Sequence, residues 1–180
     1  YLFFKIYDDQ SPEYIMVVVG SGDNSYLVGK MAAFQMQGLM VAYKERFDKD
    51  NFIKNLILDN LLLVDIYNRA KKLHIATSVR RAVFLVETKQ SKDENALATI
   101  RNIFSARTRD FITAIDDSGI IIVRELQSTE NYEDLDSIAC MLVDMLNTEA
   151  MTFAWVAYSN IAEDISRLPD TYKEAHTALE

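Results

Sequence analysis

Three carboxylates have the clearest capacity for chemistry in this chain. Glu87 follows a continuous apolar run at residues 82–86, and Asp116 and Asp117 begin a polar turn at residues 116–119. If the run and the turn meet at one edge of a sheet, their oxygen atoms suit Mg²⁺ or Ca²⁺. The alternative, which we favour, is a solvated turn in which Asp and Gly supply the backbone geometry. We expect no bound metal, and we keep Glu87, Asp116 and Asp117 as the candidate ligands.

The other reactive side chains do not form a catalytic arrangement. His74 and His176 are far apart in the sequence, and Cys140 is the single cysteine. A zinc site needs closely spaced Cys and His ligands, and a nucleophile needs a base beside it. Cys140 lies in an amphipathic pattern, so we expect it in the core. The sequence predicts no catalytic residue and no cofactor.

Charge and cysteine content narrow the class of protein. Lys and Arg number 19 against 27 Asp and Glu, a net charge of −8, which argues against direct binding of nucleic acid by this chain. One cysteine excludes an internal disulfide and fits a reducing compartment. No apolar run reaches the roughly 18 residues of a membrane span. We expect a cytoplasmic protein without membrane contact.

The N-terminal part predicts a hairpin followed by long helices. Apolar runs at residues 2–7 and 14–19 flank a polar turn, a hairpin signal. Residues 25–47 are predicted as a Met-rich helix that is apolar on more than one side, so it could line a ligand pocket or a dimer seam. A helix follows over residues 48–73, which contain no Gly or Pro; the two helices either run on or bend at residues 47–48. The first helix has apolar or small residues spaced by four and three: Leu27, Met31, Phe34, Gly38 and Val41.

The helix predicted at residues 48–73 has an unusually broad apolar arc. At about 100° per residue, apolar side chains cover roughly half of its circumference. Leu58 and Leu62 lie one turn apart on the otherwise polar side. A helix that covers one domain needs a narrower stripe, so we expect this helix to pack against its own domain and against a second body. The proposed dimer or relay surface comprises Phe52, Leu56, Leu58, Leu62, Leu63 and Ile66.

From residue 80 the pattern is strand, helix, strand, strand, helix, strand, helix. The run at residues 82–86 predicts a central strand. Helices that cross between strands imply a sheet with helices packed on it. The predicted fold class is α/β (α+β), with an N-terminal β-hairpin and a long helical connector before the sheet.

The order of elements and several local sequences resemble a known family. Residues 60–73 read NLLLVDIYNRAKKL, residues 80–87 read RRAVFLVE, and residues 171–179 read TYKEAHTAL. They resemble the degenerate GGDEF-like domain of CdaR/PucR-type transcriptional regulators, which has the nucleotide-cyclase-like fold. The resemblance implies three parts: residues 1–24 as the end of an upstream sensory module, residues 25–79 as a helical connector, and residues 80–180 as the GGDEF-like domain.

The resemblance also bears on catalysis. Active diguanylate cyclases carry Gly-Gly-Asp-Glu-Phe on the hairpin between the second and third strands, where the acidic pair helps to bind the catalytic metal. Here the hairpin reads Ile-Asp-Asp-Ser-Gly-Ile at residues 115–120, with one glycine and no glutamate. We therefore expect a protein that is not an enzyme.

The favoured hypothesis is a signal-relay and dimerisation region of a bacterial transcriptional regulator. The chain begins at Tyr1 in a strand-like run and stops at Glu180 in a helical pattern, so we expect it to be part of a longer protein. The expected partners are a second copy and a small-molecule effector at the sensory module, with DNA contacted only by a C-terminal helix-turn-helix outside this chain. The alternatives are a direct sensor of a sugar-acid-like molecule and a degenerate nucleotide-binding domain.

Overall fold

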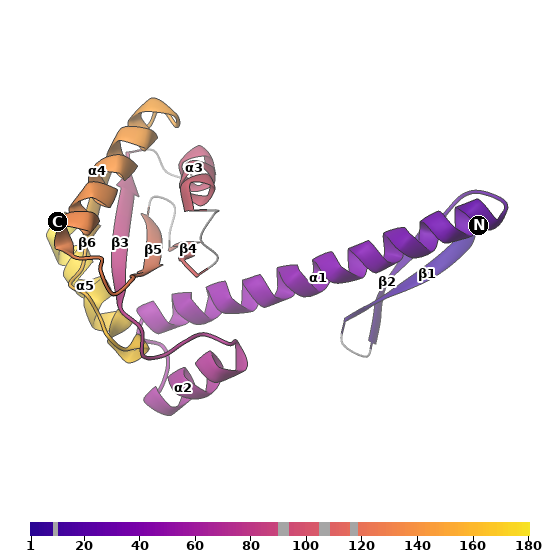
Figure 1. Ribbon diagram of the computed structural model, residues 1–180, viewed down its shortest axis with the longest axis horizontal. Helices are drawn as coiled ribbons and strands as arrows, with labels where there is room; N and C mark the ends of the chain where they lie inside the picture. The colour runs from indigo at the N-terminus through magenta and orange to yellow at the C-terminus, as the bar shows by residue number, and fades with distance from the viewer. Residues whose placement is uncertain (9–10, 90–93, 105–108, 116–118) are drawn as a thin grey trace. The chain divides into compact units, whose positions relative to one another are not determined.

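The computed structural model describes residues 1–8, 11–89, 94–104, 109–115 and 119–180 (Figure 1). Contacts within the chain group into two compact units, residues 1–49 and residues 50–180. The part of the expected connector from Asp50 onward thus packs with the C-terminal unit. The two units are called unit 1 and unit 2 below.

Unit 1 contains the predicted hairpin. Strands β1 (Leu2–Asp8) and β2 (Ser11–Val18) pair antiparallel, with Phe4 opposite Met16. Successive side chains of a strand point to opposite faces, so Phe4 and Ile6 share the face that packs on the following helix. Ile6 is only 3% exposed, whereas Phe3 on the other face is 68% exposed. The hairpin is therefore covered on one face among the described residues.

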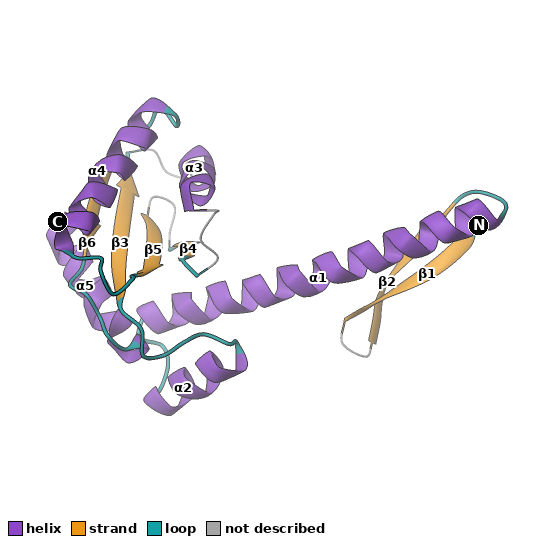
Figure 2. Ribbon diagram, in the orientation of Figure 1, coloured by secondary structure: helices purple, strands orange, loops and turns teal. Residues whose placement is uncertain are grey.

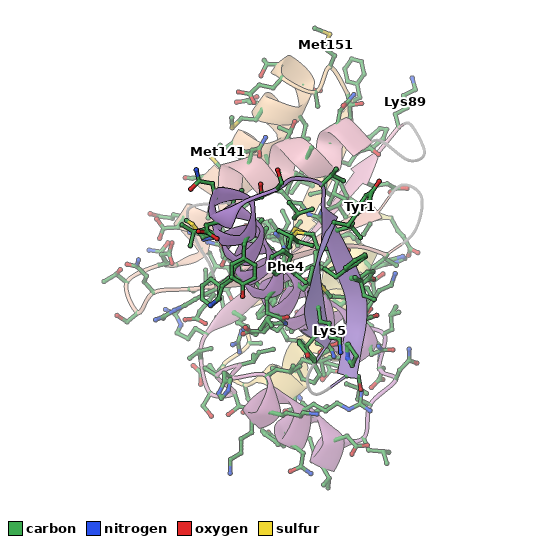
Figure 3. All side chains as sticks on the ribbon, turned by 90° about the vertical axis from the view of Figure 1, so that its right-hand side faces the viewer. Tyr1, Phe4, Lys5, Lys89, Met141 and Met151 are labelled. Carbon is green, nitrogen blue, oxygen red and sulfur yellow. The ribbon has the colours of Figure 1, made fainter. Side chains whose placement is uncertain are left out.

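Helix α1 (Asp23–Ile57) lies along this hairpin, from which Phe4 is labelled in Figure 3. A glycine and a glutamine of the helix contact the hairpin. A Cβ atom at Gly29 would lie 2.4 Å from the ring of Phe4, so only glycine permits this approach. Gln37 accepts a hydrogen bond from the backbone N–H of Tyr7 (2.7 Å) and donates one to its carbonyl. Tyr7 pairs with Pro12, which has no N–H to donate, so the glutamine side chain provides partners for the β1 backbone.

The helices end at different residues from those expected. α1 runs through residues 47–48 without a break, and the prediction of one helix over residues 48–73 is wrong. Asp59 adopts φ 60°, Asp59 N–H donates to the carbonyl of Leu56 (3.0 Å), and Asn60 N–H donates to that of Asn55 (3.0 Å). This is a Schellman motif, in which a left-handed residue satisfies the last carbonyls of a helix. Asp tolerates that conformation better than most residues, and so ends α1 without Gly or Pro.

Helix α2 (Leu63–Lys72) ends in the same manner. His74 has φ 55°, and Ile75 N–H donates to the carbonyl of Ala70 at 2.9 Å. Ala70 and Ile75 are both buried, which provides the apolar contact that accompanies this motif. The two turns direct α2 and the chain after it back onto the core of unit 2.

The sheet of unit 2 confirms the predicted fold class. Its four antiparallel strands are ordered β4 (Phe111–Ala114), β5 (Gly119–Glu125), β3 (Arg81–Thr88) and β6 (Ala154–Tyr158). Helix α3 (Glu94–Phe104) connects β3 to β4, and α4 (Tyr132–Thr148) connects β5 to β6 (orange strands and purple helices in Figure 2). This is the split βαβ arrangement of ferredoxin-like domains. As predicted from its apolar run, β3 is a central strand.

Helices cover both faces of this sheet. On one face, Phe84 and Ile122 pack in a core with α3 and α4, including Ile100 and Leu142. On the other, the strands contribute Val83, Leu85, Ile121 and Val123 to a second core. That core is completed by the last turns of α1, by α2 and by α5 (Leu168–Leu179). Unit 2 is thus a three-layer structure with the sheet in the middle.

Cys140 is not in either core. It lies on α4 and is exposed, contrary to the expectation from sequence. The buried positions of α4 are Leu135, Leu142 and Leu146, which recur at helical spacing. Cys140 lies on the solvent side of α4, because those three leucines form the apolar stripe that packs on the sheet.

A hydrogen-bonded carboxylate joins α2 to the short helix η1 (Ile165–Arg167). Asp164 Oδ1 accepts from Tyr67 Oη (2.8 Å) and from the backbone N–H of Ser166 (2.9 Å). Desolvation acts to raise the pKa of Asp164, but the bonds from Ser166 and Tyr67 and the charge of Arg81 outweigh it, so the pKa is lowered. Its stabilising contribution should be complete above the unfolded pKa of about 3.9 and be lost as pH falls through the lower folded pKa.

This contribution predicts that the stability of the parent protein depends more strongly on acid pH than the stability of Asp164→Asn. Asp164→Asn should be less stable than the parent at pH 7, and the gap should close as pH falls below about 4 because the parent carboxylate becomes protonated. Denaturant unfolding at a series of pH values measures the gap. A gap that stays constant across the series would contradict this assignment, while Asp170→Asn, at an exposed carboxylate, is the control.

Candidate functional site

Glu87 lies near the C-terminal end of the central strand β3. It is exposed, in the second-last position of β3, and its Cα pairs with that of Gly119, the first residue of β5. On the other side it pairs with Trp155 of β6. The strand register therefore brings Glu87 beside the β4–β5 hairpin, the relation that the sequence pattern suggested.

The other two candidate ligands, Asp116 and Asp117, lie outside the described residues. Within the part of the chain that the structure describes, no three His, Cys, Asp or Glu side chains gather closely enough to hold a metal ion. Whether the three candidates converge stays a prediction.

A lysine that sequence reasoning overlooked reaches this hairpin from α1. Lys54 Nζ donates to the carbonyls of Ala114 (3.1 Å) and Ile115 (3.3 Å), the residues at the end of β4. No local sequence signal connects Lys54 with carbonyls about sixty residues later. Only the packing of α1 on the sheet brings these groups together. The last turn of α1 is thus bonded to the first strand of the hairpin.

The six residues of the proposed dimer or relay surface fall into two groups. Phe52, Leu56 and Ile66 are 3%, 0% and 5% exposed, because they complete the core of unit 2. Leu58, Leu62 and Leu63 are 39%, 75% and 60% exposed. Phe52 and Leu56 of α1 and Ile66 of α2 lie on helix faces that pack in the core, whereas the other three residues lie at the turn between the two helices and point to solvent. We call Leu58, Leu62 and Leu63 the turn patch.

Buried ion pairs stabilise the opposite end of the sheet. Arg81, 1% exposed, lies 3.7 Å from Glu125 and donates to the carbonyl of Ala76 at 2.6 Å. Burial lowers the pKa of Arg81, and the charges of Glu125 and Asp164 act in the opposite direction. Arg124 forms a second pair with Glu130 (2.6 Å). These groups face neighbouring protein atoms and serve to join β3 and β5 to the surrounding loops.

Tyr158 is the other strongly perturbed group. Its hydroxyl donates to Asp136 of α4, and this bond, together with desolvation, raises the pKa of Tyr158 to about 12. A phenol that keeps its proton at neutral pH cannot act as a base there. The pair joins β6 to α4.

The residues from the α1–α2 turn to the C-terminus match a known family. A family model described as a GGDEF-like domain matches residues 60–180. The chain belongs to the GGDEF-like domain family. No curated protein and no solved structure gives a significant match. Among the helices that the structure describes, none is long and apolar enough to cross a bilayer.

The GGDEF-like domain requires more of the chain than the matched residues. Its matched region begins at Asn60, yet Phe52, Ile53, Leu56 and Ile57 of α1 are all at most 3% exposed in its core. The last turns of α1 are therefore a structural part of this domain.

Proposed function

We propose that this chain is a signal-relay and dimerisation region of a bacterial transcriptional regulator of the CdaR/PucR type. The family membership supports the GGDEF-like part of this proposal, and the sequence resemblance of residues 60–73, 80–87 and 171–179 supports the regulator. In this proposal an effector binds an upstream sensory module in the cytoplasm. A helix-turn-helix domain C-terminal to this chain contacts DNA.

The observation that carries the relay is the double attachment of α1 to the GGDEF-like domain. Leu56 and its apolar neighbours form part of the core, and Lys54 holds the carbonyls that lead into the β4–β5 hairpin. Packed cores do not deform continuously, so a shift or rotation of α1 must repack discrete contacts. α1 also carries Gly29 and Gln37, which bind the hairpin of unit 1. One helix therefore belongs to both units.

Relay by α1 requires two packing states with different effector affinity. The bonds of Lys54 provide a local difference between such states: they form when the last turn of α1 is seated and break when it shifts. Lys54→Met should therefore change effector-dependent output more than it changes the stability of the domain, because the lysine is only half-buried.

A domain that relays without catalysis should not bind nucleotide tightly. The hairpin at residues 115–120 lacks the second glycine and the glutamate of the cyclase motif, which would approach the nucleotide and hold the metal. Isothermal titration of the chain with GTP and Mg²⁺ should show no binding at micromolar concentrations. Micromolar binding would overturn the non-enzymatic assignment and favour a nucleotide-handling domain.

The turn patch should contribute to assembly with a second copy or a neighbouring domain. Large apolar side chains that are this exposed and adjacent mark an interaction surface. Leu58→Asp combined with Leu62→Asp should weaken self-association, measured as absolute mass by light scattering over a wide concentration range. The circular dichroism spectrum should be unchanged because both residues lie outside the core. An unchanged mass with an unchanged spectrum would contradict the assignment of this surface.

A further inference from the structure

The two edges of the sheet in unit 2 differ in how they are protected. At the β4 edge, Ile115 N–H donates to the carbonyl of Gly119 (3.0 Å), so the backbone groups of Ala114 point away from β5. The carbonyl of Ala114 accepts a hydrogen bond from Lys54, and β4 is only four residues long. Short strands and charged side chains commonly protect an edge from pairing with another chain.

Strand β6 forms the other edge, beside β3, and lacks such protection (Figure 1). Residues 151–158 read MTFAWVAY, with no charge, no Gly and no Pro. The carbonyl of Phe153 is bonded to Lys89 N–H (3.1 Å), and Ser159 N–H is bonded to the carbonyl of Val83 (2.9 Å). Backbone bonds alternate along an antiparallel pair, so the residues of β6 whose N–H and C=O groups point away from β3 are Ala154, Val156 and Tyr158.

These three residues leave backbone groups available at the edge. None of the three is buried, and none of their backbone groups is hydrogen-bonded to another described residue of the chain. A row of free N–H and C=O groups along a strand binds an extended polypeptide, whose own backbone completes the ladder. The geometry of the edge therefore identifies an extended chain as the occupant.

The side chains of β6 indicate which residues the added strand carries on one face. Phe153 is 71% exposed and Trp155 is 55% exposed, and they share a face because side chains alternate along a strand. Residues directly opposite on a neighbouring strand share the same face and contact each other. Apolar residues at alternate positions of the added strand would cover these two aromatic side chains.

The other face of the edge is flanked by negative charge near Tyr158. Asp136 of α4 accepts a hydrogen bond from the hydroxyl of Tyr158, and Glu174 of α5 accepts one from the backbone N–H two residues later (3.2 Å). Both carboxylates are exposed, and α4 carries four acidic and no basic residues. Lys173 of α5 is bonded to the aspartate of the α1–α2 turn, and Lys89 lies at the opposite end of β6. Basic side chains on the added strand would complement the charge near Tyr158.

We propose that the edge of β6 binds an extended segment of another protein, in which apolar residues alternate with Lys or Arg, as a fifth strand of the sheet. A second copy of this chain is a poorer occupant, because pairing two β6 strands brings two acidic α4 helices to one interface. The proposal goes beyond the relay function and does not depend on it, since relay is tested by effector-dependent output.

Binding of a synthetic peptide to the whole chain tests the backbone pairing. The probe is fluorescein-labelled Lys-Val-Lys-Val-Lys-Val, measured by fluorescence anisotropy at near-physiological salt. Two further versions are N-methylated, either at the lysines or at the valines. Only alternate N–H groups of a strand face its neighbour, so one version should bind at least about tenfold more weakly than the other. Both carry the same charge. Equal affinities of the two versions, or no binding of the unmethylated peptide, would overturn the proposal.

A pair of double variants tests the charge complementarity. Asp136→Asn with Glu174→Gln should weaken binding of the unmethylated peptide about fivefold, because two carboxylates beside the edge become neutral. Asp23→Asn with Asp48→Asn removes the same charge from unit 1 and should leave the affinity unchanged. Equal weakening by the two double variants would show attraction to net charge alone and would contradict a site at β6.

Blocking the edge within the protein locates the peptide. Val156→Pro removes an N–H that points away from β3, so the bonds between β6 and β3 remain, and peptide binding should be lost. Val156→Thr keeps the N–H and should bind like the parent. Urea unfolding with the Trp155 signal checks that unit 2 stays folded; if it does not, the N-methylated peptides decide. Peptide binding retained in a folded Val156→Pro protein would overturn the proposal, as would a halved mass in light scattering, which would establish a second copy as the occupant.

Discussion

Replacing Leu56 with alanine should lower the free energy of unfolding of unit 2 by about 3 kcal/mol. Leu56 is fully buried and packs in the core formed by α1, α2, α5 and one face of the sheet. Removing its branched end loses the burial of those carbons and leaves a cavity that the surrounding side chains fill only in part. Urea unfolding followed by fluorescence measures the change. The single tryptophan, Trp155, lies in unit 2, so the signal reports on that unit.

The matched control for this prediction is Leu58→Ala, two residues later. Leu58 is 39% exposed and lies after the last turn of α1, so its removal should cost less than about 1 kcal/mol. Because Leu56 precedes the residues that match the family model, the comparison also tests whether α1 is part of the domain. Equal small effects for both variants would show that α1 does not belong to the core, and the relay would lose its structural basis.

Replacing Glu125 with glutamine should destabilise unit 2 by a similar amount, about 3 kcal/mol. Glu125 lies on β5 beside Arg81 of β3, at 3.7 Å, and it also binds Arg109 at 3.0 Å. Arg81 is almost completely buried, so it cannot recover hydration when its nearest carboxylate becomes neutral. Asp164 then provides the remaining negative charge that acts on Arg81, and a buried cation that has lost its ion-pair partner is more costly than the loss of one hydrogen bond. Urea unfolding with the Trp155 signal again provides the measurement.

A double variant separates the free-energy cost of an uncompensated buried charge from the net contribution of the ion pair to stability. Arg81→Met with Glu125→Leu replaces both charges with apolar side chains of similar size, and it should be closer to the parent in stability than Glu125→Gln alone. The comparison requires three proteins unfolded under the same conditions. If the double variant is less stable than the single one by a further 3 kcal/mol or more, Arg81 contributes through packing and its bond to Ala76 instead of through the charge pair.

Local sequence patterns were sufficient for the strands, for the helices that follow residue 80 and for their order, but not for the boundary between α1 and α2. The apolar run at residues 82–86 predicts a central strand because both of its faces must be buried, and β3 is central. The hairpin at the N-terminus follows from two β-prone runs around a polar turn, and α4 begins after Asn131, which caps it. Such features depend on residues close together in the chain, where hydrophobic period and turn chemistry act directly.

The candidate site depended on contacts that no local pattern encodes. The sequence indicated Glu87 and the hairpin, but the pairing of Glu87 with Gly119 is a matter of strand register, and the bonds of Lys54 depend on how α1 packs on the sheet. The end of α1 shows the same limit: Asp59 adopts a left-handed conformation although the leucines on both sides of it suit a continuing helix.

What the sequence determined by itself was the α+β class, the succession of strands and helices, the resemblance to GGDEF-like domains and the absence of the cyclase motif from the hairpin. The tertiary structure decided which apolar residues are core and which are surface. Phe52, Leu56 and Ile66 became core, whereas Leu58, Leu62 and Leu63 stayed exposed. The physical reason is that the hydrophobic effect is not directional. An apolar residue type indicates that burial of the side chain is favourable, but the arrangement of elements distant in the sequence decides whether it is buried and against which residues.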